Sequence, residues 1–237
     1  MSYQHRWIDG SAIDLPVGKV VCVGRNYAEH ARELGNEVPD APILFIKPAS
    51  SLAPMAPSFS IPTDQGEVHH EIEMALLVSE RLQNVDALTA QWSMAGFGLG
   101  LDLTLRDVQN ELKKKGHPWE RAKAFDGACP VSGFIDARGV SWKQPIEISL
   151  EVNGALRQRG NTTQMLFPVF QLVAQMSKVF TLEPGDIILT GTPSGVAALQ
   201  PGDQLVATFG NTLKVSTTVT ARENTEEVAG NEIRERW

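Results

Sequence analysis

The sequence predicts an α+β fold, a mixed β-roll or barrel with a few peripheral helices. Strand-like segments outnumber helix-like segments and do not alternate with them regularly, which argues against a parallel doubly wound sheet. Two similar turns, at residues 183–186 and 200–203, each precede an apolar strand and indicate hairpin-like corners of an antiparallel β body. No linker-like stretch divides the 237 residues. We therefore expect a single domain over 1–237, with its core at about 18–220.

The composition narrows the class of protein. With 42% hydrophobic residues, the chain can bury a substantial core as one domain. A net charge of -7, with no basic run longer than residues 113–115, argues against a nucleic-acid partner. No apolar stretch is long enough to span a membrane, and the polar start is not that of a signal peptide. Cys22 and Cys129 are the only cysteines, which excludes a disulfide framework and indicates a cytoplasmic protein.

Short runs rich in apolar residues predict the strands of this fold. They lie at residues 19–24, 43–47, 69–78, 96–106, 146–152, 187–190, 204–209 and 213–220. Residues 1–17 precede the first strand as an opening segment, irregular or an edge strand. Prolines recur between residues 39 and 62, so 43–47 is the one strand expected there.

Three helices are predicted among the strands. The first spans residues 26–34, with Asn26 as its N-cap and Gly35 closing its end. A second helix covers about 86–95. The third is amphipathic and is capped by residues 161–163. Its inner face carries Met165, Val169, Leu172, Val173 and Met176.

Two charged segments complete the chain. Residues 107–124 are helix-prone but broken at Gly116 and Pro118, so we expect a segment that closes as a lid when a ligand binds. Residues 221–237 are charged with few apolar positions, and we expect a surface helix or a C-terminal tail.

Glu71 and Glu73 lie one residue apart in the predicted strand 69–78. Apolar residues at every second position indicate a half-buried strand, on which the two glutamates point to the same face. Two like charges so close together repel and raise one pKa, unless a hard cation such as Mg2+, Mn2+ or Ca2+ binds there. From this pattern alone, an exposed acidic strand edge is as plausible as a metal site.

The strand at 96–106 alternates throughout. One face carries Phe97, Leu99, Leu101, Leu103 and Leu105 and must be core. The other face carries Gly98 and Gly100, and glycines there often mark the close approach of a ligand or another backbone. The glycines are followed by three polar side chains, and we expect these to form the floor of a polar pocket: Asp102, Thr104 and Arg106. Asp102 is therefore the expected third carboxylate, and three carboxylates favour Mg2+ or Mn2+ over Zn2+.

His30 and Glu33 lie three residues apart and share a face of the first predicted helix. A carboxylate beside an imidazole orients the ring and can make it a general base. By spacing alone, however, an ordinary solvated pair is favoured.

Other polar residues are uninformative when taken singly. Lys123, like Arg25 and Lys47, reads as an ordinary surface charge, and Gln109 carries no signal of its own. The glycine-rich stretch 190–195 could present backbone N–H groups and a threonine hydroxyl to an oxyanion, or it could be a plain turn.

Taken together and in this order, these pieces resemble the fumarylacetoacetate hydrolase family, specifically its short acylpyruvase branch. The matching pieces are Gly24-Arg25-Asn26-Tyr27 with His30 and Glu33, Phe45-Ile46-Lys47-Pro48, His70-Glu71-Ile72-Glu73, Leu101 to Asp107 with Gln109, Lys123 with Phe125-Asp126, and Thr190-Gly191-Thr192-Pro193 with Gly195. They extend over nearly the whole chain, and their joint presence is far more specific than any one of them.

The resemblance implies a β-roll of the family's C-terminal-domain type, acting as a single catalytic domain and usually as a homodimer. It implies a Mg2+ or Mn2+ ion held by Glu71, Glu73 and Asp102, the carboxylates that the strand patterns also bring together. It implies catalytic roles for His30, Glu33 and Lys123. Candidates to hold a small oxo-carboxylate substrate are Arg25, Lys47, Arg106, Gln109 and Thr192.

The implied activity is that of a metal-dependent hydrolase, which cleaves the carbon–carbon bond of acylpyruvates such as acetylpyruvate or fumarylpyruvate to pyruvate and a carboxylic acid. His30, oriented by Glu33, would take a proton from the attacking water, and Lys123 would lie near the reacting oxygens. The alternative is an oxaloacetate decarboxylase or keto–enol tautomerase, since both reactions pass through an enolate and need no attacking water. A non-catalytic metal-binding protein of the same fold is the least expected reading.

Overall fold

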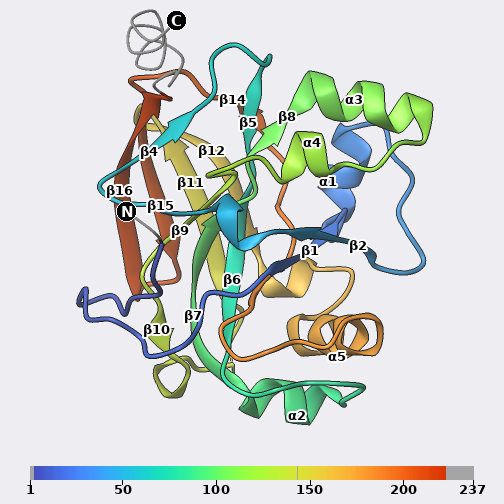
Figure 1. Cartoon of the computed structure of the whole chain (residues 1–237), viewed down its shortest axis with the longest axis vertical. Coiled ribbons are helices and arrows are strands. Elements are labelled where there is room, and N and C mark those ends of the chain that lie inside the picture. The colour runs from blue at the N-terminus through green and yellow to red at the C-terminus, as the bar shows by residue number, and fades with distance from the viewer. Residues whose placement is uncertain (1–2, 143, 223–237) are drawn as a thin grey trace, which may run out of the picture.

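The computed structural model describes residues 3–142 and 144–222 and has an eight-stranded sheet at its centre (Figure 1). Its strands run in the order β2 (Ile43–Lys47), β1 (Val20–Gly24), β13 (Ile187–Leu189), β6 (Ile72–Val78), β7 (Met94–Leu101), β9 (Cys129–Val131) and β3 (Leu52–Pro54), and β10 (Ile135–Asp136) also pairs with β7. The β1–β13 and β3–β9 pairs are parallel and the others are antiparallel. The sheet is therefore mixed, as the sequence predicts.

Two smaller sheets complete the β-roll. The five-stranded sheet, on the left of Figure 1, has the order β12 (Ala155–Asn161), β11 (Glu147–Val152), β15 (Gln204–Phe209), β16 (Leu213–Ala221) and β4 (Ser58–Ile61). The three-stranded sheet has the order β14 (Ala197–Ala198), β5 (Val68–His70) and β8 (Thr104–Leu105). Strands outnumber helices in this part of the chain, which confirms the predicted α+β class.

The helices are short and peripheral. They are α1 (Ala28–Glu33), α2 (Ala87–Trp92), α3 (Arg106–Lys115), α4 (Glu120–Lys123) and α5 (Val169–Val179), with 3-10 turns at Ala49–Ser51, Ala137–Gly139 and Thr162–Gln164. In Figure 1, α1, α3 and α4 gather on the right of the sheets, while α2 and α5 lie together at the bottom. Over the described ranges, none of these helices has the length and apolar character needed to cross a membrane.

The central sheet is packed on both faces. Strand β6 is buried at every position: Met74 and Leu76 belong to one hydrophobic cluster, and Ala75 and Leu77 belong to another. The prediction of a half-buried strand is therefore wrong. A strand that is covered on both sides shows no polar face, and here only Glu73 interrupts the apolar run.

The glycines of β7 leave room for protein atoms and not for the predicted ligand. A Cβ at Gly100 would lie 2.6 Å from Cδ2 of Leu189, and a Cβ at Gly98 would lie 2.8 Å from Oγ of Ser132. The glycines thus admit neighbouring protein atoms, from Leu189 and Ser132, and do not line a ligand pocket. Asp102 follows them in sequence but lies beyond the end of β7.

Because of this close packing, we expect Gly98→Ala to lower the free energy of unfolding by roughly 1–3 kcal/mol. The added methyl would displace the Ser132 hydroxyl, which accepts a hydrogen bond from the Leu99 N–H at 2.9 Å and donates one to the Gly133 carbonyl at 2.7 Å. Urea unfolding measures the loss. Gly139→Ala is the matched control, because a Cβ there meets only ordinary contact at 3.5 Å. Equal stability of the two variants would contradict this account.

The first helix begins later than predicted. Tyr27 is its N-cap, and no side chain caps it. The Asn26 amide instead ties together two distant loops: Nδ2 donates to the carbonyl of Thr190 at 2.8 Å, and Oδ1 accepts from the N–H of Phe167 at 2.7 Å. Gly35 follows the helix with a φ of 64°, the left-handed conformation expected of a residue that closes it.

The amphipathic helix is also shorter than predicted. Asn161 caps the 3-10 turn Thr162–Gln164, and α5 begins only after Pro168. The five residues of the predicted inner face are all buried, although Met165 precedes the helix. Residues 155–161, which were not expected to be a strand, form β12.

Two edge strands were also missed, and both lie in the proline-rich region. Strands β3 and β4 are the last strands of their sheets, and each pairs with a single neighbour. An edge strand tolerates proline because one side of its backbone needs no ladder hydrogen bond. Proline spacing therefore did not exclude strands there.

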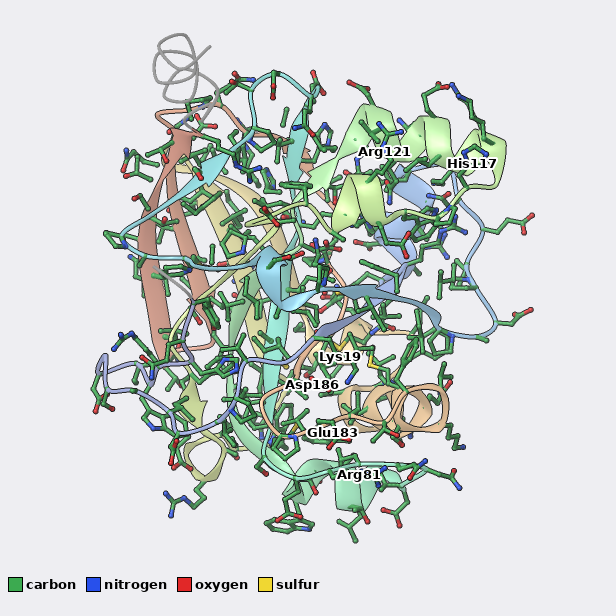
Figure 2. All side chains as sticks on the ribbon, in the orientation of Figure 1. Lys19, Arg81, His117, Arg121, Glu183 and Asp186 are labelled. Atoms are coloured by element: carbon green, nitrogen blue, oxygen red, sulfur yellow. The ribbon has the colours of Figure 1, made fainter. Side chains whose placement is uncertain are left out.

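The two similar turns share one local structure but are not hairpin corners. In each turn, the carboxylate of the closing aspartate accepts a hydrogen bond from the first residue's N–H at 2.8 Å. The turn at 183–186 joins α5 to β13, and the turn at 200–203 joins β14 to β15, which belong to different sheets. Figure 2 shows Lys19 beside Asp186, with which it forms an ion pair.

The last strand in the described ranges, β16, ends at Ala221. Residues 223–237 of the predicted tail lie outside the described residues. The single catalytic domain over the full chain stays a prediction.

Candidate active site

Two predicted ligands lie where paired strands change sheets. Glu71 separates β5 from β6, and Asp102 follows β7 just before β8. The Asp102 N–H donates to the Glu71 carbonyl at 2.9 Å, so the two breaks stand side by side. At a break of this kind the side chains leave the strict alternation of a strand, and both carboxylates turn toward a common point.

Glu73 completes a group of three buried carboxylates. One oxygen from each of Glu71, Glu73 and Asp102 lies within 4.8 Å of the other two. Glu73 Oε2 accepts a hydrogen bond from the Gly191 N–H at 2.5 Å, which fixes its orientation. All three carboxylates were predicted from the strand patterns, and the structure brings them together.

The site balances these charges with buried cations. Lys123 Nζ donates to Glu71 Oε2 at 2.9 Å and to Asp102 Oδ2 at 2.6 Å, while Arg106 pairs with the other oxygen of Glu71. Burial acts to lower the pKa of Lys123, but Asp102 and Glu71 outweigh it and raise the pKa above its usual value. Lys123 is therefore held as a cation between Glu71 and Asp102.

This environment shifts the pKa values of Glu71 and Glu73 in opposite directions. Burial raises the pKa of Glu71, but Lys123 and Arg106 outweigh burial and hold it well below its usual value. Burial, together with the charges of Asp102 and Glu71, raises the pKa of Glu73 well above its usual value. The charged form of Glu73 is thus disfavoured in the metal-free fold, and a divalent cation bound beside it would favour that form. An all-oxygen donor set of this charge fits Mg2+ or Mn2+.

Lys47 lies behind the carboxylates, fully buried. Its Nζ lies 2.8 Å from Asp102 Oδ1 and donates to the carbonyls of Ala128 at 3.0 Å and of Leu103 at 3.3 Å. A hydrogen bond to the carbonyl of Lys123 joins β2 to α4. In this position Lys47 supports Asp102 and Lys123 and does not reach the cavity.

His30 and Glu33 form the predicted pair, with 3.3 Å between Nδ1 and Oε2. His30 is buried at 5% exposure, and the Gly195 N–H donates to both Glu33 oxygens, at 3.0 and 3.1 Å. Because a carboxylate can only accept, Nδ1 is the donor in this pair, and in the neutral ring Nε2 then carries the lone pair. The glycine-rich turn at 190–195 therefore positions both the histidine pair and Glu73.

One cavity, of about 40 Å³, collects most of the predicted site. The predicted residues that line it are Arg25, His30, Glu71, Glu73, Asp102, Arg106, Gln109, Lys123 and Thr192. Glu33 and Lys47 are not on its wall and act through His30 and Asp102. Four polar or aromatic lining residues were not predicted: Asn36, Phe45, Lys113 and Trp119.

Helix α3 supplies one wall of the cavity. Arg106, Gln109 and Lys113 follow one another at positions i, i+3 and i+7, which is one face of a helix. Gln109 Oε1 accepts a hydrogen bond from Arg106 at 2.7 Å. Helices α3 and α4 are separated at Gly116, as the sequence predicts, and closure of this segment over the cavity stays a prediction.

The Thr192 hydroxyl already has two hydrogen-bond partners within the protein. It donates to the Ile72 carbonyl at 2.8 Å and accepts from Nε2 of Gln158 at 2.8 Å. Thr192 therefore shapes the cavity wall chiefly by joining the glycine-rich turn to β6.

Residues 19–220 match the family described as fumarylacetoacetate (FAA) hydrolase, C-terminal. This chain belongs to that family. Oxaloacetate tautomerase YcgM of Escherichia coli (strain K12) is 50% identical to it over 208 residues, which cover 87% of this chain and 95% of the relative. Mitochondrial oxaloacetate tautomerase FAHD1 of Homo sapiens is 43% identical over 188 residues, 79% of this chain and 85% of the relative.

The crystal structure of fumarylpyruvate hydrolase from Pseudomonas aeruginosa, in complex with Mn2+ and pyruvate, has a TM-score of 0.86 and 34% identity, and the match covers 94% of this chain and 97% of that one. These similarities confirm the resemblance seen in the sequence and the predicted fold. The chain is an enzyme of the fumarylacetoacetate hydrolase family.

Proposed function

We propose that this enzyme is an oxaloacetate keto–enol tautomerase dependent on Mg2+ or Mn2+. The observation that carries the proposal is the position of His30. Held by Glu33, it shares a cavity of about 40 Å³ with three buried carboxylates. A proton-transferring group beside carboxylates that would hold a metal ion is what enolisation of a 2-oxo acid requires. The two tautomerases described above, at 50% and 43% identity, support the same substrate.

Each residue has a part in this reaction. His30 Nε2 takes the proton from carbon 3 of the keto form, and the imidazolium, stabilised by Glu33, then gives a proton to the oxygen on carbon 2 to yield the enol; the reverse order of these transfers restores the keto form. Lys123, as a fixed cation, stabilises negative charge on the substrate oxygens. Glu71, Glu73 and Asp102 would hold the ion, which when bound acts as a Lewis acid toward the substrate's oxo and carboxylate oxygens.

Acylpyruvate hydrolysis is the second candidate. The same His30–Glu33 pair could take a proton from water, and fumarylpyruvate hydrolase shares the fold at 34% identity. The lower identity makes this reaction the less favoured one. Oxaloacetate decarboxylation needs no base at all and is the third.

A substrate panel separates these reactions. With Mg2+, we expect rapid interconversion of the enol and keto forms of oxaloacetate, followed by the enol absorbance, and much slower cleavage of acetylpyruvate and fumarylpyruvate. A chelator should abolish the activity and Mn2+ should restore it. Faster cleavage of an acylpyruvate than tautomerisation of oxaloacetate would reverse the assignment.

We also propose a cytoplasmic location and a homodimer. Cys22 and Cys129 are both buried as free thiols, which suits a reducing compartment. Size-exclusion chromatography with light scattering measures the oligomeric state directly.

A further inference from the structure

Two cations at the cavity have no carboxylate partner. Of the five Lys and Arg residues at the site, Lys47, Arg106 and Lys123 pair with Asp102 or Glu71. Arg25 and Lys113 also line the cavity, yet no carboxylate among residues 3–142 and 144–222 lies within 4.0 Å of either one. Two cations that face the same cavity without a counter-charge form a site for an anion.

Lys113 is held where it can face such an anion. It lies four residues beyond Gln109 on the cavity face of α3, about 6 Å further along the helix from the carboxylates. Its Nζ donates to Oδ1 of Asn36 at 3.0 Å, a neutral partner that orients the ammonium group without neutralising it. Burial lowers the pKa of Lys113, and the nearby charges of Arg25 and Arg106 lower it further, so these three cations converge on one region.

Arg25 reaches the same cavity from the end of β1. Its backbone has a φ of 61°, an unusual conformation for a residue other than glycine. Such strain at the wall of a cavity is retained when the side chain must point in a required direction. Arg25 and Lys113 thus reach the same cavity from different elements.

The charge balance defines the ligand. Lys47, Arg106 and Lys123 match Glu71, Glu73 and Asp102 in number, so Arg25 and Lys113 are left without a carboxylate partner among the described residues even before a divalent ion adds two positive charges. A 2-oxo acid with one carboxylate leaves Arg25 and Lys113 uncompensated. A dicarboxylate places its second anionic group where they converge.

We propose that Lys113, with Arg25, forms a subsite for the second carboxylate of the substrate and makes the enzyme select short dicarboxylates over monocarboxylates. This inference rests on the proposed function, because it assumes that the first carboxylate of the substrate lies at the ion that Glu71, Glu73 and Asp102 would hold. Lys113 is thereby a specificity-determining residue. Asn36 is a positioning residue that acts through it.

The test compares two ligands that differ only in the second carboxylate, malate and lactate. Their dissociation constants are measured by titration calorimetry on the full chain with saturating Mg2+. We expect the wild type to bind malate more tightly, and Lys113→Met to weaken malate binding by roughly 10- to 100-fold while lactate binding stays the same. Lys113→Arg should restore much of the preference for malate.

Lys114→Met is the matched control. It removes an equal charge from the same helical turn, but Lys114 is exposed and pairs with Glu111. We expect its ligand constants to equal those of the wild type. If Lys113 only stabilised the helix end, both variants would lower the melting temperature alike and neither would alter the ratio of malate to lactate binding.

The outcomes separate this subsite from the proposed reaction. An unchanged malate-to-lactate ratio in Lys113→Met overturns the subsite, even if the wild type tautomerises oxaloacetate. A ratio that depends on Lys113 supports the subsite, even if oxaloacetate proves inert and the reaction assignment fails. A wild type that binds malate no more tightly than lactate also overturns it.

Discussion

Glu73→Gln is expected to lower turnover by about 10³-fold, because several kcal/mol of charge stabilisation depend on the ion that this carboxylate would help to hold. The substitution keeps the size of the side chain and an oxygen to accept the Gly191 hydrogen bond, so the fold should persist. It removes one of the three negative charges that an oxygen-bound divalent cation requires. Initial rates over a Mg2+ titration measure the effect.

Although Glu73→Gln lowers turnover, the same substitution should raise the thermal stability of the metal-free protein. The raised pKa of Glu73 means that its charged form is disfavoured in the metal-free fold, owing to burial and the charges of Asp102 and Glu71. At neutral pH, above the ordinary pKa of a glutamate, the wild type bears that cost and a neutral glutamine does not. With a chelator present, we expect Glu73→Gln to melt at a higher temperature than the wild type. Added Mg2+ should stabilise the wild type and leave the variant unchanged.

Glu67→Gln supplies the control for both measurements. Glu67 also lies near β5, but its side chain is 61% exposed and pairs with His69, and neither residue lines the cavity. Its activity and its Mg2+-dependent stability should match those of the wild type. Wild-type turnover by Glu73→Gln at limiting Mg2+ would remove Glu73 from the metal site.

The acidic centre could be predicted because it depends on local periodicity. A single residue separates Glu71 from Glu73, and Asp102 follows the alternation of the next strand, so pairing β6 with β7 brings the three together. The change of sheet at Glu71 and at Asp102 could not be predicted, because it depends on which strands lie beyond the break. The glycines of β7 were misread for a related reason: sequence shows that something approaches closely, but not whether it is a ligand or Leu189.

The cations show the limit of reasoning from single residues. Lys47 has the sequence context of a surface charge and is fully buried, because three carbonyls and Asp102 from other elements surround it. Lys113 was missed, although a signal existed. Its spacing from Arg106 and Gln109 places all three on one face of the helix. Whether that face meets solvent or a cavity is decided by the packing of α3 over the site, which no local pattern contains.

His30→Ala is expected to lower tautomerisation of oxaloacetate by about 10²–10⁴-fold, the usual contribution of a general base. Hydrolysis of an acylpyruvate, if the enzyme performs it, should fall by a similar factor, since water must also lose a proton. Decarboxylation should fall much less, because loss of carbon dioxide needs no base. Enol absorbance and pyruvate release measure the two oxaloacetate reactions in one sample.

A series of variants tests whether His30 is the group that transfers the proton. An ascending limb in the wild-type pH–rate profile, from a group that must lose its proton, should vanish in His30→Ala. Glu33→Gln should give a smaller loss, because an amide can still accept the Nδ1 hydrogen bond but cannot balance the imidazolium charge. Arg32→Ala, an exposed change on the same helix, is the control and should keep wild-type rates. Equal losses of tautomerisation and decarboxylation in His30→Ala would mean that the histidine shapes the site and does not transfer the proton.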